Sequence, residues 1–168
     1  MDDLDFIAGM MSDAEVMRHY PRPLDREGSR AWIQRALDRY ARDGYGLWLV
    51  VEGSSGKPVG QVGIAVQEVA GAQEKEAGWL IHSPFWRRGY AVEAGRRVLR
   101  HAIEKLDAPH VISLIQRVNV ASVGVARKLG MTVRNEADFH GRPHDVYWIR
   151  REEWEQLQRE TAGAIDSE

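Results

Sequence analysis

The stretch from residue 76 to residue 106 constrains the fold most, because it joins a buried strand to a long amphipathic helix through a turn containing glycine. The run Glu76 to His82 reads as a buried strand, and Pro84 ends it because proline has no backbone N–H to donate. Beyond the turn, apolar residues recur at three- and four-residue steps and predict a helix packed on a sheet: Ala91, Ala94, Val98, Leu99, Ala102, Ile103 and Leu106. These features favour an α/β protein.

The turn itself, Trp86 to Ala91, has the chemistry of an anion site. A helix start leaves N–H groups unpaired, and the helix dipole makes that end positive. Arg87 and Arg88 add charge there, and Gly89 removes the Cβ that would keep a phosphate away from the backbone. The alternative interpretation of the same residues is a solvated turn with two surface arginines.

Composition limits the classes of protein that this chain can belong to. Its 168 residues suit one domain, and 43% apolar with 29% charged residues is ordinary for a globular protein. A net charge of −2 provides no bulk attraction to nucleic acid, so we do not expect a nucleic-acid partner. The absence of cysteine excludes disulfides and thiolate catalysis, and no apolar run approaches the ~20 residues of a membrane span. We therefore expect a cytoplasmic protein without a membrane anchor.

Hydrophobic periodicity predicts helices, then three antiparallel strands, a crossover helix, a strand, a helix and two closing strands. The predicted elements are short helices over 6–17, a helix over 25–42, strands over 45–52, 59–68 and 76–82, a strand over 110–118, a helix over 120–129, strands over 131–137 and 144–150, and a short helix over 152–157. We expect one domain over residues 1–160 and a disordered tail over 161–168.

This order, with specific motifs, resembles the GNAT superfamily of acetyl-CoA-dependent N-acetyltransferases, and within it the ribosomal-protein N-terminal acetyltransferases. The family turn reads Gln/Arg-x-x-Gly-x-Gly/Ala, and the equivalent run here is Trp86-Arg-Arg-Gly89-Tyr-Ala91. Trp86 departs from that pattern, which costs a side-chain contact but leaves the backbone donors. Asn119-Val-Ala-Ser122 followed by Lys128-Leu-Gly, and the last hairpin His140-Gly-Arg-Pro-His-Asp-Val-Tyr147, are similar to further motifs of the same branch.

The resemblance implies a single GNAT-like α/β domain with a mixed, mostly antiparallel central sheet flanked by helices. It implies acetyl-CoA as co-substrate, with the pyrophosphate on the turn and the pantetheine arm along a strand edge. The implied cofactor-binding residues are Leu80, Ile81, Trp86, Arg87, Arg88, Gly89, Tyr90, Ala91, Asn119 and Lys128. A backbone N–H near Ile81 would face the thioester carbonyl and stabilise the oxyanion. Acetyl transfer needs no metal, and no His, Asp and Glu grouping has convincing metal spacing.

The catalytic candidates are Glu76 and Ser122. Glu76 is the first choice of general base, and a carboxylate at a strand entrance is its structural alternative; His82, His140 and His144 are the other base candidates. The resemblance gives Ser122 the role of protonating the thiolate, and its alternative is a helix cap. Asn119 is similarly either a pantetheine contact or a local cap.

The function expected is transfer of acetyl to a primary amine, either a protein N-terminal α-amine or a small molecule, by direct attack in a ternary complex. The main alternative is a catalytically weak acyl-CoA-binding sensor or interaction module. Family members usually begin with a strand that this sequence lacks, which would leave residues 45–52 as an exposed edge. We expect a subunit contact or the opening segment to cover it, with a homodimer as the leading version.

Overall fold

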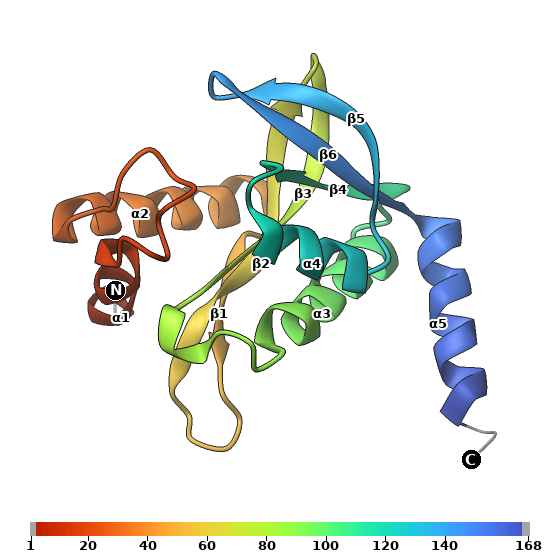
Figure 1. Ribbon diagram of the computed structural model, residues 1–168, viewed down its shortest axis with the longest axis horizontal. Helices are drawn as coiled ribbons and strands as arrows, with labels where there is room; N and C mark the ends of the chain where they lie inside the picture. Colours follow the sequence, from red (N-terminus) through yellow and green to blue (C-terminus); the bar gives the residue numbers. More distant parts are fainter. Residues whose placement is uncertain (1–2, 166–168) are drawn as a thin grey trace. The chain divides into compact units, whose positions relative to one another are not determined.

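The computed structural model describes residues 3–165, without the side chains of 163–165. The elements follow the predicted order (Figure 1): α1 (Leu4–Ser12), α2 (Arg26–Asp43), β1 (Leu47–Val51), β2 (Pro58–Val69), β3 (Ala72–Ile81), the short 3-10 helix η1 (Ser83–Phe85), α3 (Tyr90–Glu104), β4 (His110–Ile115), α4 (Val120–Lys128), β5 (Thr132–Phe139), β6 (Arg142–Arg150) and α5 (Arg151–Ile165).

The six strands form one mixed sheet in the order β1-β2-β3-β4-β6-β5. β3 and β4 are parallel, while the β1–β2, β4–β6 and β5–β6 pairs are antiparallel. A parallel neighbour requires a crossover connection, and α3 provides it. The predicted α/β domain with a mixed sheet and flanking helices is confirmed.

Within residues 3–165 no strand precedes β1, and β1 stands at one edge of the sheet as expected. The edge is partly covered by α2, because the Tyr40 hydroxyl donates to the Leu47 carbonyl (3.1 Å). α2 begins where the Asp25 side chain accepts from the Gly28 N–H (2.8 Å) and ends at Gly44, whose φ of 78° is left-handed. The last residue of the helix is thus Asp43, one residue beyond the predicted range 25–42.

The chain divides into two compact units, Met1–Ala65 with Ala77–Val98, and Val66–Glu76 with Leu99–Glu168. Strands β2 and β3 contribute residues to both units. In the first unit α1 packs on α2, and the core is built from the opening segment: Ile7, Met10, Met11, Val16 and Met17, with Trp32, Leu80 and Trp86 against them. Val16 and Met17 lie in a turn instead of the predicted helix, yet both side chains are buried.

The second unit has a sheet-based cluster of Val69, Ile112 and Val146, against which Leu114, Ala137 and Trp148 pack. α5 runs from Arg151 to Ile165, so the helix is longer than the predicted 152–157 and continues into the segment expected to be a tail. Two hydrogen bonds at helical spacing support this extension. The Gln156 side chain donates to Glu160 (2.9 Å), and the Thr161 hydroxyl donates to the Leu157 carbonyl (2.8 Å). The last three residues of the expected tail, 166–168, lie outside the described residues. No helix in the described part of the chain is both long and apolar enough to span a bilayer.

Candidate active site

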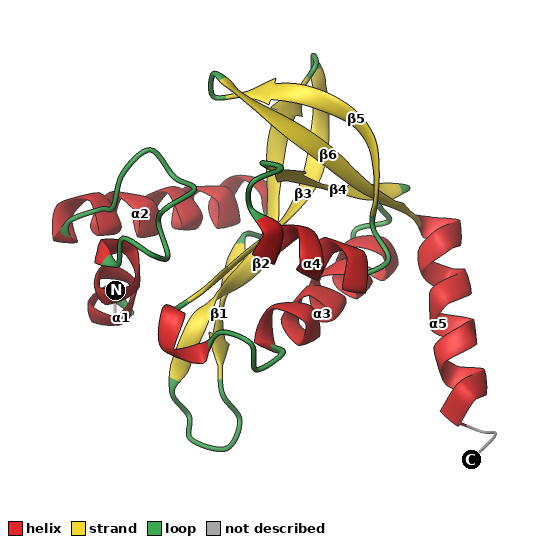
Figure 2. Ribbon diagram, viewed as in Figure 1, coloured by secondary structure: helices red, strands yellow, loops and turns green. Residues whose placement is uncertain are grey.

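The turn between β3 and α3 lies in the first unit, and Figure 2 shows η1 and the loop that leads into the helix. Arg87 and Gly89 both have positive φ, 62° and 88°. Arg87 therefore holds a backbone conformation that is uncommon for a residue with a side chain. A Cβ added at Gly89 would meet nothing within 4 Å, so the space beside this backbone is open. The requirement for glycine here is its left-handed φ together with access for a ligand.

The first hydrogen bonds of α3 run from the N–H groups of Val92 and Glu93 to the Gly89 carbonyl, each 3.0 Å. Helix geometry therefore leaves the N–H groups of Tyr90 and Ala91 without an acceptor inside the helix. With the positive end of the dipole and two exposed arginines, this turn can bind a phosphate group. The anion site stays a prediction, and the backbone geometry of the turn is compatible with it.

Trp86 anchors this turn. Its indole N–H donates to the Ile81 carbonyl (2.7 Å), and Arg18 stacks over its ring at 5.6 Å from the centroid. Trp86 also packs on the core formed by the opening segment. The residue that departs from the family motif therefore fixes the turn to the end of β3.

The end of β3 offers a free strand edge at Ile81. The His82 N–H donates to the Val59 carbonyl of β2 (2.9 Å), and N–H groups alternate in direction along a strand. The N–H of Ile81 therefore points away from β2, while its carbonyl accepts from Trp86. This direction is the one required of a donor to a pantetheine amide or a thioester oxygen.

A carboxylate at the anion turn was not anticipated from the sequence. Glu52, just after β1, accepts hydrogen bonds from Ser55 (2.5 Å) and from the Tyr90 hydroxyl. Both bonds lower the pKa of Glu52, and the bond from Ser55 has the larger effect. The same contact raises the pKa of Tyr90, whose hydroxyl donates to the carboxylate. Glu52 thus brings a negative charge to the start of α3, where a phosphate would bind.

A second carboxylate ties the opening segment to the same turn. The Ser83 hydroxyl donates to Asp13 (2.5 Å), and this bond is the main cause that lowers the pKa of Asp13. His82, one of the alternative base candidates, lies between aromatic rings, with Phe6 at 5.8 Å and Phe85 at 6.3 Å between centroids. Its surroundings are those of a packed aromatic side chain.

In the second unit, Glu76 lies where β3 and β4 pair, opposite Ile112. One carboxylate oxygen accepts from the Gln67 side chain (2.8 Å), and the other accepts from the backbone N–H of Leu114 (3.4 Å). The Glu76 carboxylate thus accepts a hydrogen bond from a backbone amide of β4 that lies beyond Ile112, the residue paired with Glu76. Glu76 is half-buried, which suits both the role of base and the structural alternative.

Asn119 caps α4: its side-chain oxygen accepts from the Ser122 N–H (3.2 Å). Asn119 occupies the cap position and Ser122 lies in the first helical turn, half-buried. Ala126 of α4 is completely buried, and Lys128 ends the helix exposed to solvent. The structure places Asn119 and Ser122 together in one capped turn.

The remaining histidine candidates belong to the β5–β6 hairpin. His140, at the turn with φ 53°, has its ring 4.2 Å from that of Phe139, and the His144 Nδ1 lies 2.9 Å from the Arg142 carbonyl. Beside this hairpin is a cavity of about 270 Å³, lined by Gln116, Arg117, Val118, Glu136, Arg142, Pro143, His144 and Asp145.

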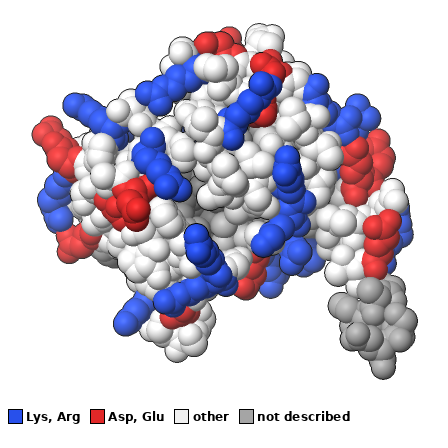
Figure 3. Space-filling view, viewed as in Figure 1, with Lys and Arg blue, Asp and Glu red and all other residues white. Residues whose placement is uncertain are grey.

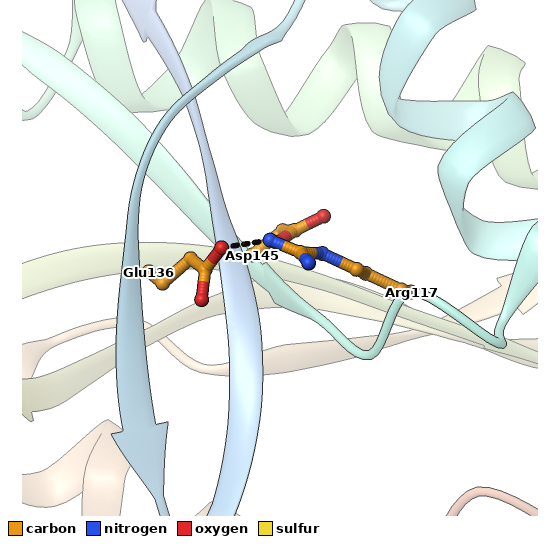
Figure 4. Close-up of polar contacts among 3 residues, drawn as sticks. All are labelled: Arg117, Glu136 and Asp145. Atoms are coloured by element: carbon orange, nitrogen blue, oxygen red, sulfur yellow. Dashed lines mark hydrogen bonds and ion pairs between the residues drawn. The ribbon is translucent and has the colours of Figure 1, made fainter.

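An ion-pair cluster (Figure 4), whose three residues all line the cavity, was missed by sequence reasoning. Arg117 reaches from the loop after β4 to Asp145 on β6 (2.8 Å) and to Glu136 on β5. Arg117 lies 19 residues before Glu136 in sequence, and the three residues form no recognisable motif, so only the pairing of the strands brings them together. On the face shown in Figure 3, basic and acidic side chains both occur, without a continuous basic surface.

Comparisons with known proteins agree with this geometry. The family model described as "Acetyltransferase (GNAT) domain" matches residues 1–132. The uncharacterized protein YkkB of Bacillus subtilis (strain 168) is 29% identical over 140 residues, which is 82% of this chain and 80% of that protein.

Two solved structures extend the likeness. An acetyltransferase from Agrobacterium tumefaciens str. C58 has 26% identity and a TM-score of 0.77, covering 89% of this chain and 86% of that one. The spermidine N-acetyltransferase from Vibrio cholerae, in complex with CoA and spermine, has 15% identity and a TM-score of 0.71, covering 91% and 92%; at that identity the likeness concerns the fold. The chain therefore belongs to the GNAT family of acetyl-CoA-dependent acetyltransferases, which acetylate amines.

Proposed function

We propose that this protein transfers the acetyl group of acetyl-CoA directly to a primary amine in a ternary complex. The observation that carries the proposal is the turn from Arg87 to Ala91, with its left-handed residues and the unpaired N–H groups at the start of α3. In this proposal the pyrophosphate binds to that backbone, and the Leu80–Ile81 edge binds the pantetheine amides as a neighbouring strand would. The N–H of Ile81 donates to the developing oxyanion of the tetrahedral intermediate.

We further propose that Glu76 accepts the proton of the amine, directly or through water, and that Ser122 protonates the departing thiolate. Asn119 and Lys128 are proposed as cofactor contacts on the capped helix α4. Glu76 is a half-buried carboxylate on β3, the strand that leads to the anion turn, which supports its assignment as the proton acceptor. Asn119, not Ser122, occupies the cap position of α4, and Ser122 lies in the first helical turn, which supports a role for Ser122 other than capping.

The acceptor proposed is a protein N-terminal α-amine or a small-molecule amine. An α-amine has a pKa near 7.7–8.0, about 2.5 units below that of lysine, so reaching its neutral form costs ~3 kcal/mol less. Such an acceptor needs only a weak base, which is consistent with a site in which no residue stands out as a strong general base. The motif resemblance to the ribosomal-protein acetyltransferases favours a protein N-terminus, and the spermidine enzyme of the same fold favours a small amine.

The decisive experiment measures thiol release from acetyl-CoA with a panel of N-terminal peptides, polyamines and lysine derivatives. Mass spectrometry of a cell extract incubated with the enzyme and isotopically labelled acetyl-CoA would then identify the acetylated product. Amine-dependent thiol release supports the proposal. Tight acetyl-CoA binding without release by any amine or extract would favour the catalytically weak acyl-CoA sensor instead.

We also propose a homodimer that covers the β1 edge. The support is physical: Val51 on β1 is 49% exposed, and an unpaired strand edge invites pairing. The contact between Tyr40 and Leu47 covers part of that edge from within the chain.

A further inference from the structure

Glu136 and Asp145 lie directly opposite each other in the β5–β6 hairpin. Two carboxylates in that register repel each other, which destabilises the pairing of the strands. Among the described residues the buried polar ones are Ser29, Gln61, Ser113 and Asp145, and Asp145 alone of these carries a charge. A buried carboxylate next to a second one requires a cation beside it.

Arg117 is that cation. Its Nε donates to Asp145 Oδ1 (2.8 Å), and its Nη2 donates to a carboxylate oxygen of Glu136. The rigid, planar guanidinium therefore points two donors toward two strands at once, whereas a lysine ammonium has no such fork. The Arg117 side chain remains 67% exposed and the Glu136 side chain 59%, while that of Asp145 is 11% exposed. The strong anchor is thus the bond to Asp145, and Glu136 fixes the direction of the guanidinium.

The backbone of Arg117 belongs to the turn that leads into α4. The Asn119 N–H donates to the Gln116 carbonyl (2.8 Å) and closes this turn around Arg117 and Val118. Asn119 then caps α4 by accepting from the Ser122 N–H. The turn is therefore held at one end by the cap and in its middle by the side chain of Arg117. Gln116, Arg117 and Val118 also form one wall of the 270 Å³ cavity, and the hairpin forms the other.

We propose that Arg117 is a positioning residue for acetyl transfer. It holds the turn of residues 116–119 against the β5–β6 hairpin, and so sets the orientation of Asn119 and the width of the cavity. The inference rests on the proposed function, in which Asn119 contacts the cofactor. It assigns to the Arg117–Glu136–Asp145 cluster a function beyond neutralising two carboxylates.

Four variants separate positioning from simple neutralisation. Arg117→Met removes the cation at similar side-chain length and leaves Asp145 unpaired. The triple variant Arg117→Met/Glu136→Gln/Asp145→Asn also removes both carboxylates, so no buried charge is orphaned. Arg117→Lys keeps the charge without the fork. Arg134→Met is the matched control, because Arg134 on β5 pairs with Glu153 of α5 in the same unit.

If Arg117 positions the turn, Arg117→Met should lower both the melting temperature and the affinity for acetyl-CoA. The triple variant should recover most of the melting temperature but not the affinity. We expect the Kd for acetyl-CoA to rise at least threefold in both, kcat to fall at least as much, and Arg117→Lys to be intermediate. Amide hydrogen exchange at Asn119 and Ser122 should be faster in the triple variant than in the wild type and in Arg134→Met.

A triple variant with wild-type affinity, turnover and exchange would show that Arg117 only neutralises the hairpin, and would overturn the proposal. The exchange measurement needs no ligand, so it tests whether Arg117 holds the turn of residues 116–119 even if the proposed function fails. Failure of the proposed function has a different signature: the wild-type protein itself would bind no acetyl-CoA and release no thiol.

Discussion

The backbone N–H of Leu114 donates to the Glu76 carboxylate at 3.4 Å, two residues beyond Ile112, the β4 residue that pairs with Glu76. A side chain thereby replaces the backbone acceptor that a continued parallel ladder would have supplied. Glu76 consequently has a structural task in addition to the proposed one of accepting a proton.

The two tasks of Glu76 are separable by substitution. Glu76→Gln keeps an oxygen that can accept from Leu114 but cannot take up a proton, so we expect lower activity, chiefly at lower pH, with a melting temperature close to that of the wild type. Glu76→Ala also removes the acceptor, and should lower the melting temperature as well. Turnover measured across pH, with thermal scans of both variants, checks this; identical pH profiles for the wild type and Glu76→Gln would assign the proton to another group or to water.

Acetyl-CoA should raise the melting temperature, because a ligand that binds only the folded turn shifts the folding equilibrium. At a concentration 100 times the Kd, the stabilisation is about 2.7 kcal/mol. Gly89→Glu should abolish the rise, since it places a side chain and a negative charge where the phosphate binds. Gly71→Glu is the matched control, with a φ of 82° and equally open space in the β2–β3 turn. A thermal scan in which Gly89→Glu still responds to acetyl-CoA would move the phosphate site elsewhere.

Glu52→Gln should strengthen acetyl-CoA binding a few-fold, because it removes a negative charge from the start of α3. The gain should shrink at high salt, as expected for exposed charges. Exposed Glu155 on α5 provides the control, Glu155→Gln. Calorimetric titration at two salt concentrations checks this, and an unchanged affinity in Glu52→Gln would mean that the carboxylate swings away when phosphate binds.

The same contact has a defined pH dependence. The pKa of Glu52 is lowered by hydrogen bonds that exist only in the folded state, so its contribution to stability is present above the ordinary glutamate pKa of about 4.5 and is lost as pH falls through the lowered value. Tyr90 has a raised pKa, so its contribution is lost at the alkaline end, as pH rises through that value. Melting temperatures of the wild type and Tyr90→Phe should therefore converge at both extremes and differ most near neutrality.

Ser122→Ala should lower turnover more than it weakens cofactor binding, as expected for a group that acts mainly in the transition state. Asn119→Ala provides the contrast, because it removes the cap of α4 and should cost about 1 kcal/mol of stability. Steady-state kinetics and acetyl-CoA titrations on both variants check the distinction. Unchanged turnover in Ser122→Ala would leave Ser122 without a part in the chemical step.

A homodimer through β1 should be weakened by Val51→Lys, which places a charge on an exposed position of the edge strand. Val133→Lys is the matched control, because Val133 is similarly exposed on β5, the strand at the opposite edge. Light scattering across a concentration series decides the matter: a wild-type protein that stays monomeric throughout would leave the cover from Tyr40 and the opening segment as the explanation.

Local sequence signals determined the elements and the anion turn. Gly44 and Gly89 adopt a left-handed backbone at the end of α2 and at the anion turn, because the conformational preference of glycine acts within a single residue. The apolar spacing that predicted α3 acts over a few turns of helix and needs no knowledge of partners. Motifs of this kind also carried the family resemblance.

Only the tertiary structure decided what depends on distant residues meeting. Trp86 became an anchor because the Ile81 carbonyl lies within its reach, and Glu52 meets Tyr90 although they are 38 residues apart in sequence. Arg117 finds Glu136 and Asp145 solely because β4, β6 and β5 pair in one register, and a shift of one residue would turn each carboxylate to the other face. Register and long-range contacts are collective properties of the packed sheet, whereas helix stops and glycine turns are properties of the local chain.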